Sequence, residues 1–269
     1  KVVTREASGK VKAGKYVAAQ KREQGLPARE VLPHALEAIV ASIPFRKSMR
    51  WGTSDVAFGR PIQWIVCLLD EDVLPVSYAG VRAGRESRGH RFLSPSLFAI
   101  SKPGEYESLL AARHVVANRT EREALMMSRV KDAARAAGGT FDTAEILVVE
   151  NASLVEEPLV VTGHYDPKFL ELPASVIRAV ARGHQRYFCV EKEGDANALL
   201  PAYVAVVNTA NNTARIQKGM DRVMTARLSD AMFFYEEDKK VALETRVDKL
   251  ATIVFHNRLG SVRDKVARI

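Results

Sequence analysis

The pattern of apolar residues changes near residue 211, and this change constrains the fold more than any other feature of the chain. Before it, short apolar runs typical of strands alternate with helical patterns, whereas after it only helical spacing is found. Two apolar stripes define the helical region: Ile216, Met220, Val223, Leu228 and Ala231, then Leu243, Val247, Leu250 and Val254. The sequence therefore predicts a mixed α/β body (α+β) over residues 1–210 and a helical C-terminal extension over residues 211–269.

Turn and cap signals set the limits of the elements in the predicted body. Thr120-Glu-Arg-Glu123 reads as a capping box, and Gly138-Gly139 ends the helix that it begins. A helix from Arg29 to Ser42 is expected to bury Leu36, Ile39 and Val40. The other predicted elements are a hairpin over residues 10–18, helices over 143–153 and 173–183, and strands over 62–69, 73–78, 98–100, 158–162, 187–191 and 203–208.

Composition describes an ordinary globular chain with an excess of positive charge. The 269 residues include 40 Lys and Arg against 32 Asp and Glu, a net charge of +8. That excess favours a polyanionic partner, although it is also typical of a basic protein kept soluble by self-repulsion. No apolar run is long enough to span a membrane, and no signal peptide is visible. Cys67 and Cys189 lack metal or redox spacing, so we expect free thiols and a cytoplasmic location.

The densest cluster of positive charge is the segment Arg82-Ala-Gly-Arg-Glu-Ser-Arg-Gly-His-Arg91. Guanidinium groups fit phosphate oxygens, and Gly84 and Gly89 would let the backbone adopt positive φ and approach a ligand. The segment is therefore either a phosphate-contacting loop or a solvated basic turn between two strands. Its candidate RNA-binding residues are Arg82, Arg85, Arg88, His90 and Arg91.

Two further places carry candidate RNA contacts. The residues Arg215, Lys218 and Arg222 recur at helical spacing on the face away from the apolar stripe. This face is either a binding surface or an ordinary solvated face of the helix. Gly183-His-Gln-Arg-Tyr-Phe188 places Arg186 beside Tyr187 and Phe188, which either stack on bases or pack in the core.

Sequence motifs of self-sufficient catalysis are missing. The chain has no phosphate-binding Gly-rich loop, no dinucleotide fingerprint and no nucleophile elbow, and its six histidines lack metal spacing. We therefore predict no catalytic residue, no metal site and no cofactor in this chain. The absence of an initiator Met and an end inside a predicted helix at Ile269 lead us to expect a fragment of a longer protein.

Five sequence blocks follow one another along the chain: Ser48-Met-Arg-Trp-Gly52 with Phe58-Gly-Arg-Pro-Ile62, Arg88-Gly-His-Arg-Phe92, Phe169-Leu-Glu-Leu-Pro173 with His184-Gln-Arg-Tyr-Phe188, Arg222 to Phe234, and Leu259 to Lys265. In this order they resemble one family, the β subunit of bacterial heterotetrameric (α₂β₂) glycyl-tRNA synthetase. The chain departs from the usual family pattern at Gly183-His184, often Gly-Asp, and at Gly219-Met-Asp-Arg-Val223, often Gly-Asn-Glu-Arg-Val.

The resemblance implies a role in glycine–tRNA ligation without chemistry on this chain. In the family, a separate α subunit handles glycine and ATP with Mg, while the β subunit mainly binds tRNA. The implied partners are that α subunit and the tRNA for glycine, with no DNA and no membrane. The body is also similar to a module of the phenylalanyl-tRNA synthetase β subunit. Two alternatives remain: a purely structural module that docks the α subunit, and a hydrolytic editing-type domain, which would need a polar pocket with a poised nucleophile.

Overall fold

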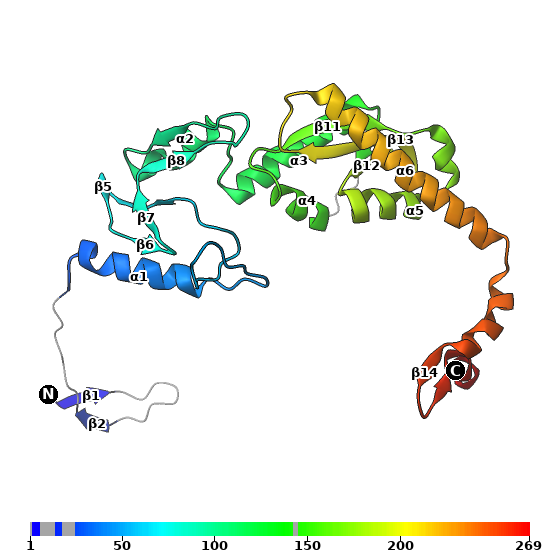
Figure 1. Cartoon of the computed structure of the whole chain (residues 1–269), viewed down its shortest axis with the longest axis horizontal. Helices are drawn as coiled ribbons and strands as arrows, with labels where there is room; N and C mark the ends of the chain where they lie inside the picture. Colours follow the sequence, from blue (N-terminus) through cyan, green and yellow to red (C-terminus); the bar gives the residue numbers. More distant parts are fainter. Residues whose placement is uncertain (1, 6–13, 18–24, 142–144) are drawn as a thin grey trace. The chain divides into compact units, whose positions relative to one another are not determined.

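The computed structural model describes residues 2–5, 14–17, 25–141 and 145–269. Contacts group the chain into two compact units, which we describe separately. The first unit contains residues 1–87 and 97–105, and the second contains residues 88–96 and 106–269. Both contain helices and small sheets, so the predicted mixed α/β class is confirmed (Figure 1).

The first unit combines one long helix with short strands. Helix α1 (Ala28–Ser42) contacts β6, and the Glu37 carboxylate accepts a hydrogen bond from the Ser77 amide at 2.7 Å. β3 pairs parallel with β7, β6 pairs antiparallel with β7, and β4 and β5 form a hairpin. The remaining pairs are β1 with β2 and β8 with β9. The strands are β1 (Val2–Arg5), β2 (Gly14–Val17), β3 (Ile65–Val66), β4 (Leu68–Leu69), β5 (Asp72–Val73), β6 (Ser77–Tyr78), β7 (Val81–Gly84), β8 (Glu86–Arg88) and β9 (Leu97–Ala99).

Two details of this unit differ from the sequence predictions. The buried residue of α1 is Pro33, whereas Ile39, predicted to be buried, is exposed because the small sheet covers little of the helix. A hairpin does form near the N-terminus, but its strands are β1 and β2, so it begins well before residue 10. Residues 10–13 and 18 of the predicted hairpin lie outside the described residues.

An antiparallel sheet forms the centre of the second unit, in the order β10-β12-β13-β11. Its strands are β10 (Thr140–Phe141), β11 (Leu159–His164), β12 (Phe188–Lys192) and β13 (Asp195–Val207). β11 pairs with β13 without interruption, from Leu159 opposite Val207 to His164 opposite Ala202. The predicted strand over residues 203–208 is thus the second half of a longer one. The turn at Gly194, which has positive φ, joins β12 to β13.

Both faces of this sheet are buried, and successive residues alternate between two cores. Phe188 and Val190 pack with Met126 and Val130 of α3 (Arg119–Ala136) on one face. Cys189 and Tyr203 pack on the other face, against Met224 and Leu228 of α6 (Thr213–Lys239) among others. The sheet therefore lies between two helical layers. The other helical elements of these layers are α4 (Glu145–Ala152), the 3-10 segment η2 (Pro167–Glu171), α5 (Ala174–Arg178) and the π-helical segment η3 (Ala179–Gln185).

The N-cap of helix α3 lies two residues before the Thr120 of its predicted capping box. The side chain of Asn118 accepts hydrogen bonds from the amides of Thr120 and Glu121, so Asn118 is the N-cap. Glu123, expected to reach back to the cap, instead pairs with Arg119 at 2.7 Å. The end was predicted correctly, because Gly138 follows the helix with a φ of +86°.

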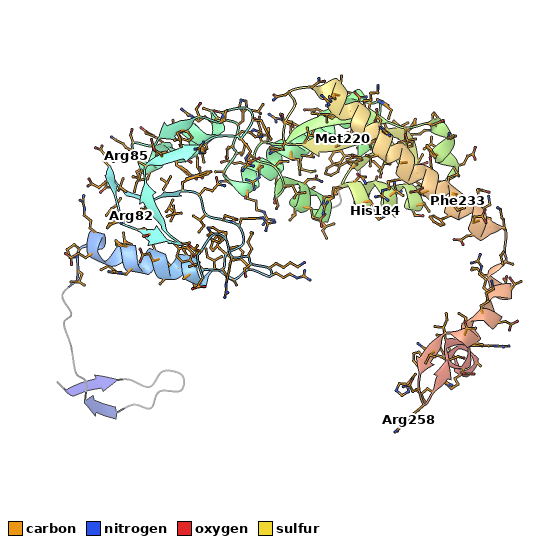
Figure 2. All side chains as sticks on the ribbon, viewed as in Figure 1. Arg82, Arg85, His184, Met220, Phe233 and Arg258 are labelled. Atoms are coloured by element: carbon orange, nitrogen blue, oxygen red, sulfur yellow. The ribbon has the colours of Figure 1, made fainter. Side chains whose placement is uncertain are left out.

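The change to helix near residue 211 is confirmed by α6, which the Asn212 side chain caps. Met224 replaces the predicted Val223 in its buried stripe, and Val223 is exposed. Met220, labelled in Figure 2, packs against the same core. The division of the chain into domains at residue 210 stays a prediction.

The predicted second C-terminal helix is only partly helical. Residues 243–252 form the 3-10 segment η4, and Val254 lies in a strand instead. The last elements of the chain are β14 (Val254–His256), β15 (Gly260–Ser261) and α7 (Val262–Arg268). Two short elements not yet described, η1 (Pro103–Glu105) and α2 (Tyr106–Ala111), precede α3 in the sequence. Among the described helices, none is long and apolar enough to cross a bilayer.

Candidate nucleic-acid interface

The basic segment of residues 82–91 has a regular backbone over most of its length. Arg82 lies on β7 and Arg88 ends β8, and the side chains of both are exposed. Arg85 is half-buried, and its guanidinium donates a hydrogen bond to the Glu71 carbonyl at 2.8 Å (Figure 2). Arg82 and Arg85 belong to the first unit, whereas Arg88 and Arg91 belong to the second.

The two glycines of this segment do not provide the predicted flexibility. Neither Gly84 nor Gly89 has a positive φ. A Cβ atom on Gly89 would instead lie 2.6 Å from the Arg113 Cβ and 2.8 Å from the Ser94 carbonyl oxygen. Gly89 is therefore required by close packing within the second unit. The predicted flexible loop is corrected to the strands β7 and β8, while phosphate contact by the arginines of this segment stays a prediction.

The side chain of His90 is completely buried, unlike that of Arg91 beside it. Its Nε2 lies 2.5 Å from the Asn208 carbonyl oxygen, and its Nδ1 accepts hydrogen bonds from the amides of Phe92 and Leu93. This arrangement requires the proton on Nε2. Because both ring nitrogens are used internally, His90 fixes the turn that follows β8 and is not available as the predicted surface contact.

Replacing His90 by alanine is expected to reduce the free energy of unfolding by about 2–4 kcal/mol, because it leaves a cavity and strips buried amides and a carbonyl of their partner. The matched control is Arg91→Ala at the exposed neighbour, with an expected change within about 0.5 kcal/mol. Urea denaturation of both variants measures the difference. Equal midpoints for the two variants would contradict the assignment of His90 to the interior.

The three predicted cations of α6 share one exposed face of the helix. Arg215, Lys218 and Arg222 are exposed, while Met224 and Leu228 on the opposite face are fully buried. No carboxylate among the described residues forms an ion pair with any of the three. Arg215 lies in the first turn of the helix, where the helix dipole adds to its positive potential. We call Arg215, Lys218 and Arg222 the α6 stripe.

Arg186 is exposed, but the aromatic residues that follow it are not. Tyr187 and Phe188 are buried, and Tyr187 stacks on Tyr203 with ring centroids 4.5 Å apart. Core packing is therefore the interpretation that the structure supports for these rings. Arg186 itself has a φ of +58°, and its Nε lies 3.4 Å from a carboxylate oxygen of Glu150.

The most prominent titratable cluster was missed by sequence reasoning. Glu157 lies between His114 Nδ1 at 2.7 Å and Arg129 Nη2 at 2.9 Å. Burial opposes ionisation of Glu157, but these hydrogen bonds outweigh it and lower the pKa of the carboxyl. The cluster ties α3 to the chain before β11. His114 and Arg129 lie 43 and 28 residues from Glu157 in the sequence, so no local sequence pattern could predict that the three side chains meet.

Buried groups elsewhere are held in their neutral form. Burial raises the pKa of the Cys189 thiol to about 11, and it also raises the pKa of the Tyr203 hydroxyl, which donates a hydrogen bond to Asp221. Among the described residues, no three His, Cys, Asp or Glu side chains are placed to hold a metal ion.

The fold and these surfaces define a class: a mixed α/β protein with exposed cations suited to a polyanion and, among the described residues, no group of side chains placed to hold a metal ion. A family model described as the glycyl-tRNA synthetase β subunit matches residues 1–269. The chain therefore belongs to the glycyl-tRNA synthetase β-subunit family, as the five sequence blocks indicated.

Several relatives named as the β subunit of glycine–tRNA ligase support this assignment. The protein from Myxococcus xanthus is 43% identical over 256 residues, which cover 95% of this chain and 36% of the relative. That from Moorella thermoacetica is 40% identical and covers 100% of this chain and 38% of the relative. The Bacillus subtilis protein is 39% identical, with coverages of 96% and 38%. The chain thus spans well under half the length of these relatives.

Proposed function

We propose that this chain is part of a glycine–tRNA ligase, in which it supplies contacts to the tRNA rather than chemistry. Glycine and ATP with Mg would be used on a separate α subunit. The observation that carries the tRNA role is the α6 stripe, three exposed cations without a paired carboxylate among the described residues. Such cations gain affinity from RNA phosphates because they release condensed counterions.

The family assignment supports the wider setting of this proposal. An α subunit and the tRNA for glycine are the proposed partners, and a cytoplasmic location follows for an enzyme of protein synthesis. The antiparallel sheet with helices on both faces is the part that we propose to be similar to the module of the phenylalanyl-tRNA synthetase β subunit. No DNA or membrane contact is proposed.

Docking of the α subunit is a second candidate function, favoured by an apolar feature of α6. Phe233, labelled in Figure 2, and Phe234 are 60% and 64% exposed. Their rings lie edge to face with centroids 5.5 Å apart. Exposed aromatic pairs of this kind are typical of protein interfaces. Loss of assembly in a Phe233→Ser/Phe234→Ser variant would assign this pair to the subunit interface.

The tRNA role is tested by replacing all three residues of the α6 stripe with glutamine in the full-length protein assembled with its α subunit. We expect affinity for tRNA to fall at least tenfold and the salt slope of binding to decrease by about 2, because three phosphate contacts are lost. Binding is measured as a function of salt concentration.

The matched control replaces three exposed cations that lie elsewhere in the second unit, Lys131, Arg135 and Lys192, and lowers the net charge equally. If both triple variants lose the same affinity for tRNA, the loss comes from the lower net charge and not from the position of the α6 stripe. An unchanged affinity and salt slope in the α6 variant would overturn the tRNA role of this helix.

A further inference from the structure

A pocket of about 310 Å³ lies between helix α4 and the π-helical segment η3 in the second unit. Its lining residues come from these two elements and from the residue that follows η3: Ile146, Leu147, Glu150, Arg182, Gly183 and Arg186. Figure 2 marks η3 by the label of His184. The volume is at the small end of the range for ligand pockets and suits one compact ligand.

The backbone around this pocket is unusual at two successive places. Residues 179–185 form a π-helix, a conformation that is rare and frequently found at functional sites. Arg186 then adopts the left-handed region with a φ of +58°, which is unfavourable for a residue with a long side chain. The Asn151 side chain holds this conformation by donating a hydrogen bond to the Arg186 carbonyl at 3.1 Å. The strained backbone thus fixes the direction in which the Arg186 side chain leaves the main chain.

The lining of the pocket combines three kinds of chemistry. Arg182 and Arg186 provide cationic donors on one side. Ile146 provides an apolar surface and is 72% exposed, although the next residue, Leu147, is buried. Glu150 provides an acceptor, and its ion pair with Arg186 joins the two polar sides. A Cβ atom built on Gly183 would meet nothing within 4 Å, so the backbone leaves this wall open.

We propose that this pocket binds a single nucleotide of an RNA chain. The phosphate would contact Arg186 and Arg182, one face of the base would cover Ile146, and Glu150 would accept a hydrogen bond from an amino group of the base. This inference rests on the proposed tRNA role and adds to it a second, base-contacting site outside the α6 stripe. Among the described residues that line the pocket, none carries a hydroxyl or thiol nucleophile.

Two single variants of the full-length protein, assembled with its α subunit, separate the two parts of this proposal. Arg186→Gly removes the cation, while glycine adopts a φ of +58° without strain, so the variant is expected to keep its melting temperature. We expect its affinity for tRNA to fall about tenfold and its salt slope to decrease by about 0.7–0.9. Ile146→Ser removes apolar surface only, so affinity should fall about threefold to fivefold with an unchanged salt slope.

Matched controls lie outside the pocket. Arg135→Gln removes an exposed arginine of α3, whose side chain is 72% exposed against 49% for Arg186, and Leu154→Ser removes an apolar residue that is 61% exposed. Both controls should bind tRNA as the unaltered protein does. Equal effects of pocket and control variants would overturn the proposal, as would unaltered tRNA affinity in both pocket variants.

Free nucleotides share the chemistry of the proposed ligand, so AMP and GMP are tested separately. Displacement of tRNA from the pocket by millimolar AMP or GMP, lost in Arg186→Gly, supports a nucleotide subsite. Saturable AMP or GMP binding that needs Arg186, combined with unaltered tRNA affinity in that variant, would assign the pocket to a free nucleotide and overturn the RNA inference. If only the α6 variant weakens tRNA binding, the pocket inference fails while the proposed function stands. If neither the α6 variant nor the pocket variants weaken tRNA binding, the pocket inference and the proposed tRNA role both fail.

Discussion

Replacing Arg178 by methionine is expected to reduce the free energy of unfolding by about 3–5 kcal/mol, the cost of leaving one member of a buried ion pair alone. Arg178 ends α5, and its Nη2 lies 2.7 Å from a carboxylate oxygen of Glu191 on β12. The side chains are only 17% and 6% exposed, so water cannot replace the lost partner of Glu191. Urea denaturation of the variant measures the cost.

The double variant Arg178→Met/Glu191→Leu serves as the control for this pair. Removing both charges should recover most of the stability, because two apolar side chains of similar size need no partner. A double variant that is no more stable than Arg178→Met would show that the loss comes from packing rather than from an uncompensated charge.

The second large effect is expected at Gly163, where β11 passes directly beside a buried tyrosine. A Cβ atom at this position would lie 2.2 Å from the Cζ of Tyr203 and 2.5 Å from a carboxylate oxygen of Asp221. Tyr203 is fully buried and its hydroxyl donates to Asp221 at 2.8 Å, so neither group has space to move. Gly163→Ala should therefore cost about 3 kcal/mol, measured as a shift in denaturation midpoint.

Gly219→Ala provides a control of opposite sign for this prediction. Gly219 lies within α6, and a Cβ atom there would meet nothing within 4 Å. Alanine is the better helix former, so this variant should gain about 0.5–1 kcal/mol. Destabilisation by both alanines would mean that the close approach at Gly163 is not what sets the cost.

The sequence predicted those parts of the fold that depend on local patterns. The helix ending at Gly138 and the change to helix near residue 211 followed from glycine chemistry and from apolar spacing. Strands β11, β12 and the second half of β13 were also recognised, although β13 is longer than predicted because its first half is paired with β12. The short strands β10, β14 and β15 were missed, and the helix predicted over residues 243–254 is a 3-10 segment followed by a strand. Choices between neighbouring residues also failed, such as Val223 instead of Met224, because only tertiary packing decides them.

The candidate site likewise has features that local sequence patterns predicted and features that depend on contacts between distant residues. The α6 stripe follows from helical periodicity alone, and the structure leaves all three of its cations exposed. The burial of His90 could not be predicted, because its partner Asn208 lies 118 residues away in the chain. Contacts at such separations also explain why the pocket beside Arg186 was missed, since its walls come from α4 and η3.

One carboxylate gives the α6 stripe a mechanical property. Asp221, placed between Lys218 and Arg222, accepts hydrogen bonds from the Tyr203 hydroxyl and from the His164 amide at the end of β11. These two bonds prevent the helix from rotating about its own axis over the sheet. The backbone positions of the three cations are therefore held at a fixed spacing, about 10 Å along the axis from Arg215 to Arg222 at the rise of an α-helix. A polyanion that matches this spacing does not have to order the helix when it binds, so only the side chains of the cations lose freedom.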